Sequence, residues 1–247
     1  MIETDNLEEP IHKTSGRLFI VATPIGNLDD ISIRALKILE DVFVIACEDT
    51  RQTIKILNKY NIKKRLLSYF HPKEQKRIPK IIGFLKQGKD VALVSDAGTP
   101  GIADPGFPLI REALAQGIKI IPIPGPSALT TALSAAGLPI HRFQFFGFPS
   151  PKKEASRKSL ESLKDESATL IFYLPSRKLP TFLKIIQETL GERRIVIARE
   201  LTKVHEEFIR GNTTELLKIL GKKPLKGELT LLVSGRQKKS LRPKTRP

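Results

Sequence analysis

The sequence predicts an α/β protein of two domains, the first with a mainly parallel sheet and the second with a mixed sheet. In the first half of the chain, short and almost wholly apolar runs alternate with helical patterns, which is typical of a parallel sheet covered on both faces. After Gly137 consecutive strand-like runs follow one another without a helix, notably across residues 201–203, which favours antiparallel pairing. The length of 247 residues suits either two small domains or one large one.

The expected elements follow from apolar runs, helical spacing and breakers. In the first domain we expect strands at 18–22, 42–46, 66–68, 91–94 and 118–122, which alternate with helices at 31–40, 50–59, 74–87, 105–116 and 127–136. In the second we expect strands at 143–147, 168–173, 195–199, 204–210 and 227–233, covered by helices at 153–163, 177–190 and 213–220. The domains are placed at 17–124 and 125–235, between a mobile N-terminus (1–16) and a basic tail (236–247).

Three loops of the first domain follow strand ends and are rich in glycine, proline and small residues. They are residues 22–30, 95–106 and 122–128. Such loops leave main-chain N–H and C=O groups open to a ligand. Because parallel strands end at one edge of their sheet, we expect these loops to form one cleft.

The chain carries six short motifs in and around these loops. They are Thr-Pro-Ile-Gly-Asn-Leu at 23–28, Glu-Asp-Thr-Arg at 48–51, Ser-Asp-Ala-Gly-Thr-Pro at 95–100, Pro-Gly-Pro at 124–126, Ser-Ala-Ala-Gly-Leu-Pro at 134–139 and Arg-Glu-Leu-Thr-Lys at 199–203. With these motifs the chain resembles the tetrapyrrole methylase superfamily from about residue 18 to 235, and within it the 2′-O-ribose methylases of small-subunit ribosomal RNA.

The resemblance implies a two-domain tetrapyrrole-methylase-like fold, with S-adenosylmethionine held between the domains. It implies a homodimer that methylates the 2′-oxygen of a cytidine in the decoding region of 16S rRNA, within the 30S subunit. The residues that it places at the cofactor are Pro24, Asp96, Ala97, Gly98, Thr99, Ile102 and Ser127. S-adenosylmethionine has no phosphate, so the phosphate-loop-like residues 83–89, which lack the required Ser or Thr at Asp90, are interpreted as a helix end.

Two aspartates of the 95–106 loop have alternative interpretations. Asp96 is expected at the cofactor, although it could simply be a turn residue that hydrogen-bonds its own backbone. Asp104 stands before Pro105 and a helical pattern, so we interpret it as the N-cap of that helix. With seven residues between the two and no His or Cys nearby, we expect no metal site.

A ribose hydroxyl needs a group that accepts its proton or holds its oxygen during methyl transfer. The candidates are Asp49, Glu200 and Lys203, with Glu48 as a further carboxylate. Acids also favour helix N-termini, which is an equal alternative for Asp49 and the favoured one for Glu48. Lys203 could orient the ribose, bind phosphate or act as a base, or be an ordinary solvated lysine.

The charge indicates a polyanionic partner. The chain has 42 Lys+Arg against 26 Asp+Glu, a net charge of +16, in clusters that favour RNA over a small tetrapyrrole. The residues expected at RNA phosphates are Arg51, Arg199, Lys152 and Lys153, although any one cluster could be a solvated helix face.

The remaining composition predicts a cytoplasmic protein. The lone cysteine, Cys47, and the acidic N-terminus favour a reducing compartment without a secretory signal. The uncharged run at 120–140 contains four prolines, so we expect no membrane span.

Two departures from the family motifs leave rival functions open. The segment 173–178 lacks the Glu and His that relatives have there, and His71 lies at a shifted place in another motif. One rival is therefore an RNA-binding protein without turnover. The other is a corrin or porphyrin C-methylase, which the 23–28 loop and the basic charge disfavour.

Overall fold

The computed structural model describes residues 15–71, 74–222 and 225–236, and it divides into two compact units. The first consists of the chain up to Thr23 together with Ile31–Gly125, and the second of Pro24–Asp30 together with the chain from Pro126 onward. Most of the expected mobile segment 1–16 and of the basic tail 236–247 lies outside the described residues.

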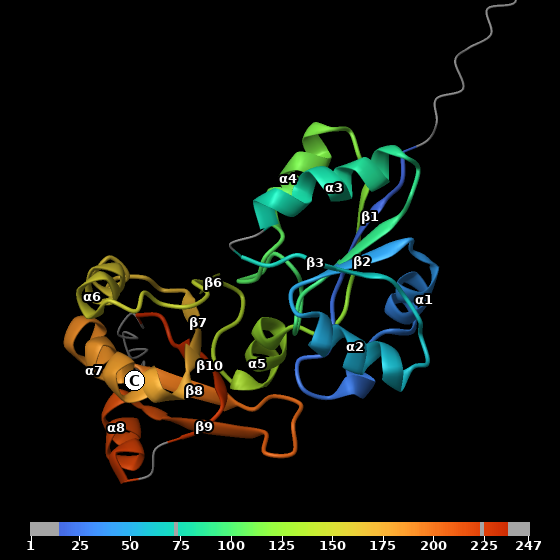
Figure 1. The fold of residues 1–247 in the computed structure, drawn as a ribbon. Coiled ribbons are helices and arrows are strands. Elements are labelled where there is room, and N and C mark those ends of the chain that lie inside the picture. Colours follow the sequence, from blue (N-terminus) through green and yellow to red (C-terminus); the bar gives the residue numbers. More distant parts are fainter. Residues whose placement is uncertain (1–14, 72–73, 223–224, 237–247) are drawn as a thin grey trace, which may run out of the picture. The chain divides into compact units, whose positions relative to one another are not determined.

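The first unit is built on a five-stranded parallel sheet. Its strands are β1 (Leu18–Val21), β2 (Val44–Cys47), β3 (Leu66–Ser68), β4 (Val91–Val94) and β5 (Ile120–Ile123), in the order β3-β2-β4-β1-β5. Figure 1 shows α3 (Glu74–Lys86) and α4 (Phe107–Ala115) on one side of it, and α1 (Ile33–Asp41) and α2 (Thr50–Lys59) on the other. The central strands β1, β2 and β4 are buried throughout because both faces of the sheet are covered.

Local capping explains where two of these helices begin. The Ser32 hydroxyl accepts the Ala35 N–H at 3.1 Å, which fixes the first turn of α1. At α2 the Asp49 carboxylate accepts the Arg51 N–H at 2.8 Å. Both helices therefore start where a side-chain oxygen satisfies an N–H that has no partner within the helix.

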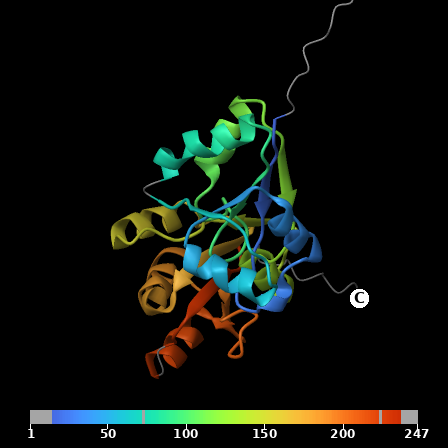
Figure 2. The same ribbon diagram turned by 45° about the vertical axis from the view of Figure 1, so that its right-hand side comes forward.

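The second unit contains a mixed sheet in the order β6-β7-β10-β8-β9. Its strands are β6 (Phe143–Phe145), β7 (Thr169–Pro175), β8 (Arg194–Arg199), β9 (Glu207–Asn212) and β10 (Glu228–Val233), and β6 and β7 form its parallel pair. One core packs this sheet against α6 (Lys153–Glu161), α7 (Leu179–Leu190) and α8 (Thr213–Lys222), and a separate core packs it against α5 (Ala128–Ala136). Figures 1 and 2 show these helices around the orange and red strands.

The predicted α/β class, with one parallel and one mixed sheet, is confirmed. The expected helix at 213–220 begins at Thr213 as α8, and α3 ends at Lys86 before Gly88, so residues 83–89 do form a helix end. The strand expected from residue 204 begins only at Glu207, because residues 200–206 form a turn in which Thr202 has a φ of 64°. Within the described part of the chain, no helix is long and apolar enough to cross a membrane.

The interpretation of Asp104 as a helix N-cap is wrong. Helix α4 begins at Phe107, and its N-cap is Gly106 at a φ of 151°, a backbone conformation that favours glycine. A Cβ at this position would lie 3.2 Å from the Gly101 nitrogen, so the turn also leaves little room for a side chain. Asp104 therefore lies in the loop before the helix, where its carboxylate serves another purpose.

Candidate functional site

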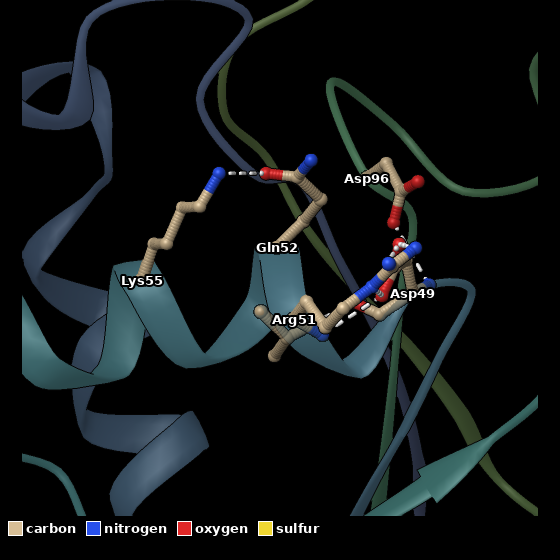
Figure 3. A network of polar contacts seen from close by, with 6 residues as sticks. Asp49, Arg51, Gln52, Lys55 and Asp96 are labelled. Atoms are coloured by element: carbon tan, nitrogen blue, oxygen red, sulfur yellow. Dashed lines mark hydrogen bonds and ion pairs between the residues drawn. The ribbon is translucent and has the colours of Figure 1, made fainter.

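The carboxyl ends of β2 and β4 bring two predicted acids together. The parallel register pairs Cys47 with Val94, so the segments that follow these residues leave the sheet side by side. The Asp96 carboxylate accepts the main-chain N–H of Asp49 at 2.9 Å, as Figure 3 shows. The Asp96 side chain is exposed, so this bond leaves it able to accept from a ligand as well.

Two interactions of the Asp49 carboxylate hold this residue, in addition to the bond from its N–H to Asp96. It caps α2, and Arg51 folds back so that its Nε lies 3.0 Å and its terminal nitrogen 2.6 Å from the Asp49 carboxylate oxygens (Figure 3). These hydrogen bonds lower the pKa of Asp49. The helix-capping alternative for Asp49 is thus real, and Arg51 is engaged by a carboxylate even though its side chain is 85% exposed.

Asp49 and Asp96 belong to a carboxylate cluster with Glu48 and Asp104. Partial loss of hydration in the folded protein raises the pKa of Glu48, of Asp96 and, to about 6, of Asp104. Mutual repulsion adds to each shift: Asp96 raises the pKa of Glu48, Asp49 that of Asp96, and Glu48 that of Asp104. The carboxylate cluster therefore carries excess negative charge, which favours the binding of a cation.

Sequence reasoning missed Asp104 as a member of this cluster. Ser95, which directly follows β4, partly offsets the rise in the pKa of Asp104 through a side-chain hydrogen bond. The Asp-Pro pair that suggested a cap concealed this role, and the only signal was its place in the same loop as Asp96.

Gly98 is pinned to the end of β1. Its N–H donates to Thr23 O at 3.0 Å and its C=O accepts from Thr23 N at 2.8 Å, in an isolated antiparallel bridge. The bridge fixes the shape of the 95–101 loop, and a φ of 81° makes Gly98 suited to it. Gly98 therefore contributes by shaping the loop. It does not offer its N–H to a ligand, because that N–H is already bonded to Thr23 O.

The other predicted cofactor residues lie in different surroundings. Ala97 is exposed, Thr99 is half-buried, and Ile102 exposes 42% of its surface, all in the loop after β4. Pro24 and Ser127 belong to the second unit, where Pro24 is buried and Ser127 is the N-cap of α5.

The turn after β8 joins Glu200 and Lys203 in one network of ion pairs. The Lys203 ammonium lies 3.2 Å from Glu200 Oε1 and 3.0 Å from Glu228 Oε2, and Glu200 also accepts the Glu228 N–H at 2.9 Å. The Glu228 N–H and the Lys203 ammonium lower the pKa of Glu200. Burial works to lower the pKa of Lys203, but its two carboxylate partners outweigh burial and raise it. At neutral pH this turn therefore presents a protonated lysine and an ionised glutamate.

The same turn holds the loop at 24–30. The Thr202 hydroxyl accepts the Asn27 N–H at 3.0 Å, and a Cβ on Gly26 would lie 2.6 Å from Lys203 Cγ. The loop packs so closely against this turn that Gly26 has no room for a side chain.

The remaining basic predictions are not equivalent. Arg199 donates to Lys226 O at 2.7 Å and pairs with Glu207 at 3.2 Å, so its guanidinium is partly engaged. Lys152 and Lys153, at the start of α6, are exposed. Among the described residues there is no group of three or more His, Cys, Asp or Glu side chains that could hold a metal.

A family model described as Tetrapyrrole (Corrin/Porphyrin) Methylases matches residues 17–217. The chain belongs to the tetrapyrrole methylase family. A protein of Thermotoga maritima named "Ribosomal RNA small subunit methyltransferase I" is 48% identical over 222 residues, which cover 90% of this chain and 100% of that protein. A Bacillus subtilis protein of the same name is 43% identical over 220 residues, covering 89% of this chain and 75% of that one.

Solved structures of the family share the fold. A cobalt precorrin-4 methyltransferase of cobalamin biosynthesis superposes with a TM-score of 0.68 at 16% identity, covering 88% of this chain and 94% of that one. A uroporphyrin-III-C-methyltransferase from Thermus thermophilus has a TM-score of 0.62 at 19% identity, with coverage of 88% and 94%. The predicted family and its two-domain fold are confirmed.

Proposed function

We propose that this chain transfers the methyl group of S-adenosylmethionine to the ribose 2′-oxygen of a cytidine in the decoding region of 16S rRNA. The observation that carries the proposal is the 48% identity to a protein named ribosomal RNA small subunit methyltransferase I, along that protein's whole length. The tetrapyrrole enzymes of known structure resemble this chain at only 16 to 20% identity, which reflects the fold.

The carboxylate cluster fits the proposed methyl donor. S-adenosylmethionine carries a sulfonium and an ammonium group, has ribose hydroxyls that donate hydrogen bonds, and supplies the methyl group on its sulfur. The four acids, of which only Asp49 forms an ion pair with Arg51, suit such a ligand, and they would repel a nucleoside phosphate. The exposed face of Ile102 offers an apolar surface in the same loop.

Within this site, Asp96 accepts hydrogen bonds from the ligand while it holds the Asp49 N–H. Gly98 gives the loop its path, and Ala97 and Thr99 leave room beside the main chain. Pro24 and Ser127 remain part of the proposal through the family motifs alone.

The pKa directions favour positioning roles for the three catalytic candidates. Asp49 and Glu200 have lowered pKa values, and the pKa of Lys203 is raised, so none is suited to accept a proton near neutral pH. Lys203 is better suited to hold a phosphate or ribose oxygen as a cation, with Glu200 fixing its position. Asp49 similarly orders Arg51 and the start of α2.

An RNA partner is consistent with the net charge of +16, since Lys and Arg side chains neutralise phosphates and release their counterions. Lys152 and Lys153 are the exposed candidates. Arg51 and Arg199 would contact an RNA phosphate after releasing their carboxylate partners, Asp49 and Glu207. The proposal further includes a homodimer that acts on the 30S subunit in the cytoplasm.

The test is mass-spectrometric mapping of ribosomal RNA from cells that lack this chain. We expect one ribose methyl group to disappear, to return with the wild-type protein, and to stay absent with Lys203→Gln. Lys184→Gln, an exposed site on α7 with the same charge change, is the matched control and should restore the methyl group. An unchanged methylation map would overturn the proposal.

A parallel assay with radiolabelled donor distinguishes the rivals. It offers 30S particles, naked 16S rRNA and a tetrapyrrole precursor side by side. Methyl transfer to the tetrapyrrole would identify a C-methylase, and RNA binding without transfer would identify the non-catalytic relative.

A further inference from the structure

The second unit contains a cavity of about 420 Å³ where β8 begins and β10 ends. The turn with Glu200 and Lys203 follows the other end of β8, so within this unit the cavity is separate from that turn. Its lining includes Lys164, Arg193, Arg194 and Arg236, one acid, Glu192, and the neutral polar residues Ser234 and Asn212. Neither the family motifs nor the proposed reaction accounts for these residues.

Arg193 is fixed in place at this cavity. Its main-chain N–H donates to the Thr213 hydroxyl at 3.1 Å, and its guanidinium donates to Leu190 O at 3.2 Å and to Lys164 O at 2.7 Å. Only 8% of the residue is exposed. A guanidinium held this way needs little further ordering to bind an anion, and it retains other N–H donors.

The negative charge around Arg193 does not balance the positive charge. Four basic residues line the cavity against one acid, Glu192, which accepts the Thr214 hydroxyl at 2.8 Å, and Arg236 pairs with Asp165. Among the described residues, no ion pair is formed by Arg193, Arg194 or Lys164. Burial and the neighbouring Arg236 accordingly lower the pKa of Arg193, although Asp165 partly offsets them. An anion in the cavity would relieve this excess.

Ser234 adds a neutral donor to the basic groups. Its hydroxyl accepts the Arg194 N–H at 3.1 Å, which fixes the oxygen and leaves the hydroxyl proton able to donate. The residue is 4% exposed. Buried hydroxyl and guanidinium donors around one space match the several acceptor oxygens of a phosphate group.

We propose that this cavity binds a phosphate group. The source favoured by the charge is a phosphodiester of the RNA substrate, and in that form the inference rests on the proposed function. In the sequence, Arg236 begins a segment with six basic residues at 236–246 and no acid, a composition that favours a polyanionic ligand. A free phosphate monoester has the same chemistry and is the other source.

The test uses Arg194→Gln in the full-length protein. Arg194 is exposed and its side chain makes no described ion pair, whereas replacing Arg193 would also break two bonds to main-chain carbonyls. Arg111→Gln on α4 makes the same charge change at an exposed site outside the cavity and is the matched control. Lys164→Gln is a second cavity variant, and circular dichroism verifies that all variants fold.

Binding of each protein to 16S rRNA is measured across a range of salt concentrations. If the phosphate is a phosphodiester, Arg194→Gln and Lys164→Gln weaken binding by about tenfold and reduce the slope of log K against log salt by about 1. Arg111→Gln should change both quantities much less.

A titration with inorganic phosphate separates the second source. If a free phosphate is the ligand, RNA binding is unchanged, and phosphate shifts the amide NMR signals of Arg193 and Arg194 in the wild type but not in Lys164→Gln. If neither RNA binding nor the phosphate titration depends on these residues, the inference is overturned. Cofactor uptake and methyl transfer are measured separately on the same proteins, so a failure of the proposed reaction is distinguishable from a failure at the cavity.

Discussion

The replacement Asp104→Asn should stabilise the protein at neutral pH and weaken the binding of a cationic cofactor. Folding raises the pKa of Asp104 from 3.8 to about 6, because burial and the charge of Glu48 disfavour the carboxylate. For a fully shielded group this change corresponds to about 3 kcal/mol. Since Asp104 is only half-buried, water screens part of the effect, and we expect about 1 to 2 kcal/mol.

The pH dependence of this gain has a definite sign. Between about pH 4 and pH 6 the folded protein keeps the Asp104 proton that the unfolded chain has released, so the wild type loses stability as the pH rises. Asparagine has no charge to bury. The difference in the free energy of unfolding between variant and wild type should therefore be near zero below about pH 4 and reach its full value above about pH 6.

The assay is urea unfolding followed by circular dichroism at a series of pH values, because the chain has no tryptophan. Asp90→Asn is the control with the opposite sign. Burial works to raise the pKa of Asp90, but the hydrogen bonds and charge of Arg17 outweigh it and lower the pKa. Its replacement should lower the free energy of unfolding by about 1 kcal/mol at neutral pH, and this loss should vanish as acid protonates Asp90 in the wild type. A variant Asp104→Asn that is less stable than the wild type at pH 7 would refute the reasoning.

Three further predictions concern other parts of the chain. Gly26→Ala should lower stability by about 1 to 3 kcal/mol in urea unfolding, since its Cβ would lie 2.6 Å from Lys203 Cγ; an unchanged midpoint would show that the loop at 24–30 yields without strain. Cys47, with its pKa raised to about 11 by burial, should react with iodoacetamide at pH 8 at least about a hundredfold more slowly in the folded protein than in urea, and equal rates would contradict its burial. Ser32→Ala should cost about 1 kcal/mol by removing the cap of α1, while Ser32→Asn should retain it; equal losses in urea unfolding would argue against capping.

The sequence predicted the elements well where local signals agree. Buried strands such as β1 and β4 are uninterrupted apolar runs, and α2 and α8 begin at residues suited to capping. The prediction for Asp104 was wrong because an Asp-Pro pair before a helical pattern commonly marks a helix start, whereas the turn at Gly106 places the start of α4 at Phe107.

The electrostatics of the site depend on contacts that local patterns do not contain. Glu228 lies 25 residues after Lys203 in the chain, yet it reaches that ammonium because β10 pairs with β8. Likewise, the cavity gathers Lys164, Arg193 and Arg236 from separate segments. The motif residues could be identified from the sequence, whereas the direction of their pKa shifts could be inferred only from the tertiary structure.

Calorimetric titration of the protein with S-adenosylmethionine tests most directly the claim that the carboxylate cluster holds a cationic methyl donor. We predict that the wild type binds the donor at pH 7.5, that Asp96→Asn binds it about tenfold more weakly, and that Asp41→Asn, an exposed site at the end of α1, binds it like the wild type. Wild-type protein that takes up neither the donor nor its demethylated product, or an Asp96→Asn variant with unchanged affinity, would contradict the account.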